Sequence, residues 1–289
     1  RNLAYSPEAS VRKSAYEAEI AAYEKVEDAI AFSLNYIKNQ VTMLSEKRGY
    51  ASPLAMTLEQ SRMKRETLDA MMAAIDEYLP VFRKYLRKKG GMLGHVNGLP
   101  WYDLFAPLGK ADKTYSIEEA KQYLIDTFTK LTPEMADLMR EAFENEWIDF
   151  YPRKGKEGGA FCAGAMWLKQ SRILTNYDGY FGSVDTLAHE LGHAFHNRQI
   201  ENHAPLNQDY PMPVAETAST FNEVHLGKAA RAEASGEELL NLLENDIKEQ
   251  TQCIVDIYSR YLFETAVFEQ SQNKFLMADD LKQIMLDAQ

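Results

Sequence analysis

Residues 186–196 read Thr-Leu-Ala-His-Glu-Leu-Gly-His-Ala-Phe-His, or TLAHELGHAFH. On an α-helix, which turns about 100° per residue, His189 and His193 lie one turn apart on the same face. Two imidazoles placed in this way can share one metal ion, and Glu190 projects from the flank of that face, close enough to reach a water on the metal. The stretch therefore predicts a helix that carries two zinc ligands and a general base.

The residues around the motif favour this helix. Segment 185–197 contains no proline, and apolar residues recur four positions apart on the side expected to face inward: Leu187, Leu191 and Phe195. We predict Ser183 as the N-cap, and because glycine is unfavourable inside a helix, we expect close packing at Gly192. Core histidines satisfied by carboxylates, without a metal, are the competing interpretation.

A catalytic zinc ion takes three protein ligands and keeps one position for water. Downstream of the histidines, Pro213 is placed to open a helix with Glu216 in its first turn. We predict Glu216 as the third ligand, and Glu223, seven positions on, as the residue that holds a ligand imidazole in its metal-binding tautomer. His196 lies about 10 Å along the axis from His189, so we expect it to support the site and not to bind the metal.

Helix signals dominate the remainder of the chain. Serine or threonine followed by proline and an acid, or a capping box, marks most of the expected helix starts. The expected helices cover about residues 6–44, 62–89, 116 onward, 133–147 and 235 to beyond 268. We expect the glycines after Lys89 to end the second helix, and an ordered connector over residues 92–113.

Residues 155–181 differ, because glycines, short apolar runs and Asn-Tyr-Asp-Gly favour strands and turns. The glycines lack the spacing and the Lys-Ser or Lys-Thr ending of a phosphate-binding loop. A strand with an accessible edge around Gly159, Ala160 and Phe161 can hold an extended peptide by main-chain hydrogen bonds. A purely structural hairpin is the alternative.

The bulk composition narrows the choice of partners and compartment. The 289 residues are 45% hydrophobic and 26% charged, which is typical of a globular protein. A formal net charge of -11 disfavours nucleic acid, and no apolar run reaches the roughly 18 to 20 residues of a membrane span. The two cysteines, Cys162 and Cys253, suit a reducing compartment, so we expect a cytoplasmic protein that uses neither nucleic acid nor membrane. The oligomeric state is left open.

Several stretches together resemble one known family, the oligoendopeptidase F branch of the thimet-type oligopeptidases, which are zinc metallopeptidases. The matching stretches are GGAFCAG from Gly158, SRILTNYDGYFGSVDTLAHELGHAFH from Ser171 and PVAETASTFNE from Pro213, in that order. Residues 6–56 and the stretch WYDLFAPL from Trp101 also look like this branch, so the resemblance covers essentially the whole chain.

The resemblance implies one zinc ion per chain, bound by His189, His193 and Glu216, with Glu190 as base and proton shuttle. It implies a mainly α, zincin-like fold with a small β-sheet bordering a deep channel, and hydrolysis of short, unstructured peptides. We expect a single catalytic region over residues 1–289, with a helical part to about 113 and a zinc-site part from about 114, belonging to a longer protein. Family members continue into a further helical segment whose histidine and tyrosines contact substrate.

Two other functions fit the same motif. A zinc carboxypeptidase or dipeptidyl carboxypeptidase of similar architecture also uses His-Glu-x-x-His with a later glutamate. A zinc- and peptide-binding helical fragment with little turnover is the alternative from outside the enzymes. Product analysis on peptides with blocked C-termini separates the first from an endopeptidase, and recovery of intact peptide identifies the second.

Overall fold

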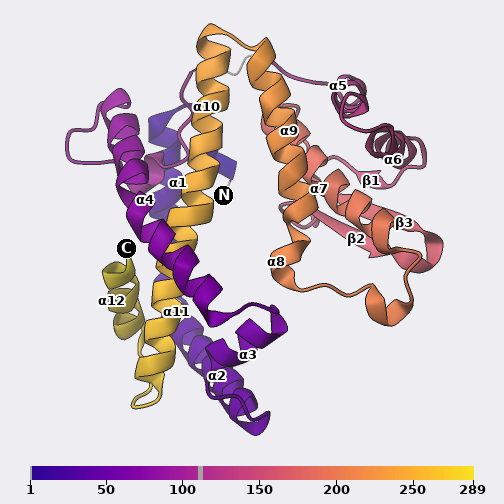
Figure 1. Ribbon diagram of the computed structural model, residues 1–289. Coiled ribbons are helices and arrows are strands. Elements are labelled where there is room, and N and C mark those ends of the chain that lie inside the picture. The colour runs from indigo at the N-terminus through magenta and orange to yellow at the C-terminus, as the bar shows by residue number, and fades with distance from the viewer. Residues whose placement is uncertain (1, 110–112) are drawn as a thin grey trace. The chain divides into compact units, whose positions relative to one another are not determined.

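The computed structural model describes residues 2–109 and 113–289. Residues 110–112, which belong to the connector expected over residues 92–113, therefore lie outside the described residues. The described chain is mainly helical with a small three-stranded sheet, which confirms the predicted fold class (Figure 1). It divides into two compact units: unit 1 runs to Leu108 and resumes at Glu244, and unit 2 comprises Gly109–Leu243.

Among the described residues of unit 1, all regular secondary structure is helical. Its elements are η1 (Asn2–Tyr5), α1 (Ala9–Tyr23), α2 (Glu27–Lys47), α3 (Pro53–Gln60), α4 (Arg65–Met92), η2 (Trp101–Asp103), the second half of α10 (Gly236–Thr251), the π-helical η5 (Gln252–Asp256), α11 (Ile257–Ser271) and α12 (Ala278–Ala288). The run from α10 through η5 to α11 confirms the predicted last long helix. Among the described helices, none is both long and apolar enough to cross a lipid bilayer.

The prediction of one helix over residues 6–44 is wrong. α1 ends at Tyr23 and α2 begins at Glu27, with Val26 between them at φ −130°. The acids that open α2, Glu27 and Asp28, lie at the positive end of the helix dipole, where negative charge is favourable. The two helices also have different partners, since α1 packs on η1 and η2 whereas α2 packs on α3, α11 and α12. Tertiary packing therefore breaks a pattern that is continuous in the sequence.

The glycine predicted to end the second helix lies inside it. α4 continues past Gly90, and the left-handed residue that terminates it is Gly94, at φ +86°. The backbone N–H groups of Gly94 and His95 donate to the carbonyls of Gly91 and Gly90 at 3.2 and 2.9 Å, forming a Schellman cap. Gly90 is buried instead at a close approach, because a Cβ there would lie 3.3 Å from the backbone nitrogen of Leu99.

Buried polar contacts join the two sequence stretches of unit 1. The Lys89 side chain is fully buried and donates to the carboxylate of Glu244 at 2.6 Å and to the carbonyl of Leu104 at 2.9 Å. Asn35 donates to the carbonyl of Leu276 at 2.7 Å and accepts from its N–H at 3.0 Å. Because a buried polar group without its partner is costly, residues from Glu244 onward are needed to complete this unit.

Unit 2 contains the sheet and the histidine motif. Its elements are α5 (Ile117–Thr129), α6 (Pro133–Glu144), β1 (Ile148–Asp149), β2 (Phe161–Ala165), η3 (Met166–Leu168), β3 (Gln170–Leu174), α7 (Phe181–Ile200), η4 (Pro205–Asn207), α8 (Met212–Ala215), α9 (Thr217–Glu233) and the first half of α10. The capping box of Ser116 and Glu119 opens α5 as predicted. α6 starts at Pro133 as predicted but ends three residues before the buried Trp147.

The sheet has the strand order β1-β3-β2. β1 pairs parallel to β3, and β2 pairs antiparallel to β3 with Phe161 opposite Leu174. The predicted strands of segment 155–181 are confirmed, whereas β1 was not predicted because two residues are too short to show an alternating pattern. Within the described residues β2 is an edge strand, and its outer side carries no strand partner.

The core of unit 2 surrounds α7, which packs against α9 and the sheet (Figure 1). Leu187 and Leu191 are fully buried and Phe195 packs on the core, as the four-residue spacing predicts. The predicted N-cap is wrong, because α7 already begins at Phe181. Ser183 instead donates its hydroxyl to Asp178 at 2.6 Å in the preceding turn.

Candidate metal centre

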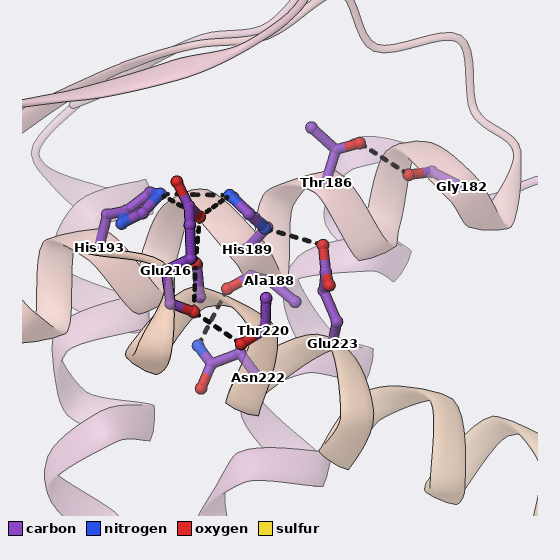
Figure 2. Close-up of polar contacts among 10 residues, drawn as sticks. Gly182, Thr186, Ala188, His189, His193, Glu216, Thr220, Asn222 and Glu223 are labelled. Carbon is purple, nitrogen blue, oxygen red and sulfur yellow. Dashed lines mark hydrogen bonds and ion pairs between the residues drawn. The ribbon is translucent and has the colours of Figure 1, made fainter. Parts of the chain in front are cut away.

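Two neighbouring helices bring three ligand atoms together. His189 and His193 lie one turn apart on α7, and Glu216 lies at the junction between α8 and α9. The two Nε2 atoms are 3.1 Å apart, and Glu216 Oε2 lies 3.2 Å from that of His189 and 3.4 Å from that of His193 (Figure 2). The predicted ligand set thus forms a small triangle of donor atoms.

The triangle fits a zinc ion. Ligands about 2.0 to 2.2 Å from a tetrahedral zinc are about 3.3 Å from one another, which matches the three separations found here. Two neutral imidazoles and one carboxylate are also a donor set that zinc prefers in catalytic sites. Among the described residues, His189, His193 and Glu216 form the group of potential metal ligands whose donor atoms all lie within 4.8 Å of one another.

Neighbouring groups orient each ligand. His189 Nδ1 lies 2.7 Å from Glu223 Oε1, which fixes the tautomer whose Nε2 lone pair faces the triangle. His193 makes a hydrogen bond to the backbone of Ala215. Glu216 Oε2 accepts a hydrogen bond from the Ser219 hydroxyl at 2.8 Å. Glu223 lies at the predicted position, beside the imidazole of His189.

The two histidines differ in their electrostatic surroundings. Burial alone would lower the pKa of His189, but the hydrogen bond and negative charge of Glu223 outweigh it, and that pKa is raised. Burial and the adjacent His189 lower the pKa of His193. The lowered pKa of His193 favours the neutral imidazole, which is the form that binds a metal, whereas the raised pKa of His189 favours its protonated form.

Close contact between α7 and α9 makes the triangle possible. Gly192 has the predicted close packing, since a Cβ there would lie 2.7 Å from the carbonyl oxygen of Ala218 and from the Cα of Ser219. The buried Asn222 of α9 donates to the carbonyl of Ala188 at 2.9 Å (Figure 2). A larger residue at 192 would move α9, and Glu216 with it, away from the histidines.

Glu190 lies next to the ligands but outside the triangle. Its side chain is buried, and no hydrogen-bond partner for Oε2 exists among the residues described. Burial raises the pKa of Glu190 to about 7, with the charge of His189 opposing that rise and the carboxylates of Glu216 and Glu223 adding to it. A carboxyl group with a pKa near the working pH suits a residue that both accepts and donates a proton.

The site opens into a cavity of about 310 Å³. The metal-site residues line it together with Ala160, Phe161, Cys162, Asn197, Tyr210 and Ala215. Two of the three predicted substrate-strand residues, Ala160 and Phe161, therefore share a cavity with the predicted ligands. Gly159 is not among the cavity residues and forms the turn before them at φ +83°. Sequence reasoning missed Tyr210 and Asn197; the spacing of four from His193 to Asn197 was the available signal.

His196 has surroundings of its own. Its ring packs on that of Tyr210 with 4.3 Å between the centroids, and its buried Nδ1 has no hydrogen-bond partner in the described part of the chain. Burial lowers the pKa of His196, so the ring is neutral at pH 7. It does not belong to the converging ligand group, and its contact with the site runs through Tyr210, which lines the cavity.

One helix carries His-Glu-x-x-His, and a carboxylate that follows it in the chain completes a site with three donors. This arrangement is typical of the metal sites of metallopeptidases. The chain belongs to Peptidase family M3, whose sequence profile matches residues 2–284. This membership confirms the family resemblance found in the sequence.

Individual relatives agree with this assignment. Oligopeptidase PepF of Bacillus subtilis is 33% identical over 249 residues, which are 85% of this chain and 35% of the relative. Among solved structures, PZ peptidase A with an inhibitor covers 99% of this chain with a TM-score of 0.79 at 20% identity, and oligoendopeptidase-F from Enterococcus faecium covers 99% with a TM-score of 0.67 at 18%. At these identities the two structures support the fold. The chain spans 51% and 44% of their lengths and about a third of the length of the Bacillus relative.

Proposed function

We propose that the chain is the catalytic region of a zinc-dependent endopeptidase that hydrolyses internal bonds of short, unstructured peptides. The observation that carries the proposal is the triangle of His189, His193 and Glu216, with edges of 3.1 to 3.4 Å, beside the buried carboxyl group of Glu190. Membership of Peptidase family M3 supports the activity. Two free cysteines also support the expected cytoplasmic location.

The residues have separate tasks in this reaction. A bound zinc ion supplies Lewis acidity toward water and the scissile carbonyl. Glu190 accepts a proton from the attacking water and delivers it to the departing amine, for which its raised pKa is suited. Glu223 keeps His189 in the tautomer with Nε2 free, and Ser219 holds the carboxylate of Glu216.

The edge strand β2 supplies the proposed peptide site. Phe161, Ala160 and Cys162 line the same cavity as the ligands, so a peptide paired along this strand passes the metal site. Pairing through backbone hydrogen bonds depends little on side-chain identity, which suits an enzyme acting on varied peptides. A peptide must be extended to pair in this way, which favours short, unstructured peptides over folded proteins.

A mixture of short peptides with free and blocked C-termini tests the proposal. Cleavage products are identified by mass spectrometry, with and without chelator, on protein whose zinc content has been measured. Chelator-sensitive cleavage inside blocked peptides is the expected result. Cleavage that requires the free carboxylate identifies a carboxypeptidase or dipeptidyl carboxypeptidase, and intact peptide recovered from zinc-loaded protein identifies a binding fragment.

The variant Glu190→Gln tests the role of the general base. It keeps the shape of the side chain but cannot take up a proton, so we expect turnover to fall about 100-fold or more while one zinc ion per chain is retained. His193→Ala is the matched comparison, since it removes a ligand and is expected to lose zinc. Turnover near the wild-type rate in Glu190→Gln would remove this residue from its role.

A further inference from the structure

One asparagine side chain holds the loop before the edge strand. Asn176 Nδ2 donates to the carbonyl oxygens of Glu157 and Gly159, both at 2.9 Å. Gly159 is in the left-handed region at φ +83°, so the backbone turns there immediately before Ala160 and Phe161. A single amide group thus fixes the two carbonyls that determine where β2 begins.

The pairing of the strands explains why Asn176 reaches this loop. In the antiparallel register of β2 and β3, Phe161 lies opposite Leu174. Continuing the register by two residues places Gly159 opposite Asn176, and the neighbouring Thr175 is fixed by a 2.9 Å hydrogen bond from its N–H to the carbonyl of Asp149. The asparagine is therefore attached to a well-anchored part of the sheet.

A second asparagine links the metal-site helix to the sheet at Ser171, the β3 residue that pairs with Gly164 of β2. Asn197 is one turn beyond His193 on α7, is buried, and donates from Nδ2 to the Ser171 hydroxyl at 3.1 Å. The same nitrogen lies 3.9 Å from the sulfur of Cys162. A Cβ on Gly164 would lie 3.0 Å from it, so strand and helix are in contact at this point.

We propose that Asn176 and Asn197 are positioning residues that hold β2 at a fixed distance from the metal ligands on α7: Asn176 through the loop before the strand, and Asn197 through Ser171, the β3 residue that pairs with Gly164. The inference rests on the proposed function, because it concerns how the peptide strand is presented to the catalytic site. Asn176 lies two residues after β3 and Asn197 lies on α7, so neither amide comes from the outer edge of β2. The outer edge of β2 therefore keeps its own N–H and C=O groups for an extended peptide.

Loss of either amide lets β2 shift relative to the zinc site without altering the ligands themselves. The test measures binding of a fluorescein-labelled octapeptide of alanine, serine and one phenylalanine, and of the same octapeptide with alternate backbone nitrogens methylated. Methylation removes the N–H donors that pair with a strand edge while leaving the side chains unchanged. All proteins carry Glu190→Gln so that no peptide is cleaved, and fluorescence anisotropy gives the affinities.

The variants are Asn176→Asp and Asn197→Asp, which keep the side-chain shape but remove the donor. We expect the parent protein to bind the methylated peptide about tenfold more weakly than the unmodified one, a loss equivalent to one or two hydrogen bonds. In each variant the unmodified peptide binds about tenfold more weakly, the discrimination falls below about threefold, and the zinc affinity is unchanged. Asn145→Asp, an exposed residue at the end of α6, is the control and behaves like the parent.

Asn176→Ala and Asn197→Ala, which remove the donor without adding a charge, replace any aspartate variant that does not fold by circular dichroism. Full discrimination retained in folded variants overturns the positioning role while leaving the proposed function intact. Equal affinity of the parent protein for the two peptides shows instead that the edge-strand part of the proposed function is wrong, and the inference falls with it. Zinc loss in the aspartate variants also contradicts the inference, since it places the defect at the ligands.

Discussion

At the scale of single residues, each of the three predicted ligand side chains has a hydrogen-bond partner outside the triangle. Glu223 is the clearest case, because its carboxylate is 2.7 Å from His189 Nδ1 and belongs to a different helix. Glu223→Ala removes the acceptor that fixes the imidazole, so we expect zinc affinity to fall about 10- to 100-fold. Competition with a chromophoric chelator measures the affinity. Glu233→Ala, an exposed acid at the end of the same helix, is expected to bind zinc normally.

Cys162 gives a prediction about pH. Burial raises the pKa of its thiol to about 12, with the Ser171 hydrogen bond opposing the rise and the charge of Glu190 adding to it. The reactive thiolate is populated only as the pH approaches that pKa, so at pH 8 about one thiol in 10⁴ is ionised. Iodoacetamide at pH 8 is therefore expected to label the exposed Cys253 and leave Cys162 unmodified.

Peptide mapping after alkylation reads out both thiols. In Cys253→Ser we expect almost no label at pH 8 and a slow reaction of Cys162 that accelerates as the pH is raised toward 10. Rapid labelling of Cys162 at pH 8 would contradict the burial-driven shift of its pKa.

At the scale of elements, the distance between α7 and α9 controls the site. Gly192→Ala places a methyl group where the Ala218 carbonyl and the Ser219 Cα lie, so the helices must separate. We expect a loss of about 1 to 3 kcal/mol in the free energy of unfolding, together with weaker zinc binding. Gly182→Ala is the matched control in the same helix, because a Cβ there has no described atom within 4 Å. Urea denaturation measures the free energy of unfolding of both variants. Equal destabilisation of the two would contradict the prediction.

Local chemistry accounts for the elements that the sequence predicts well. The capping box at Ser116, the proline at the start of α6 and the His-Glu-x-x-His face each depend on residues within a few positions of one another. The spacing of Glu216 and Glu223 also predicted that both residues lie beside His189, although the helix predicted from Pro213 breaks at Glu216, between α8 and α9. Their roles in zinc binding remain predictions.

Features that depend on distant partners were not predicted. The break before Glu27 follows from the different packing partners of α1 and α2. Tyr210 reaches the cavity from a loop with no periodic pattern, and Asn176 acts on carbonyls that lie 17 and 19 positions earlier. Such contacts are decided by tertiary structure, which single-sequence patterns do not contain.

At the scale of the whole molecule, the metal site lies entirely within unit 2. Under the proposed function zinc binds only the folded site, and we therefore expect it to stabilise that unit by about 4 kcal/mol when free zinc is 1,000 times the dissociation constant. We expect amide hydrogen exchange to slow in α7 and α9 on adding zinc, and to change little in α11 and α12. Glu216→Ala serves as the control and is expected to show no zinc effect. An equal slowing of amide exchange in both units on adding zinc would contradict the prediction.

The order of the units along the chain bears on how the protein is made. Unit 1 is interrupted by residues 109–243, and its buried Lys89 and Asn35 find their partners only in Glu244 and Leu276. A ribosome adding about 5 to 20 residues per second needs on the order of ten seconds to supply them. The continuous unit 2, with its metal-site residues, can therefore fold first, while the helices that precede it stay incomplete until residues 244–276 have been synthesised.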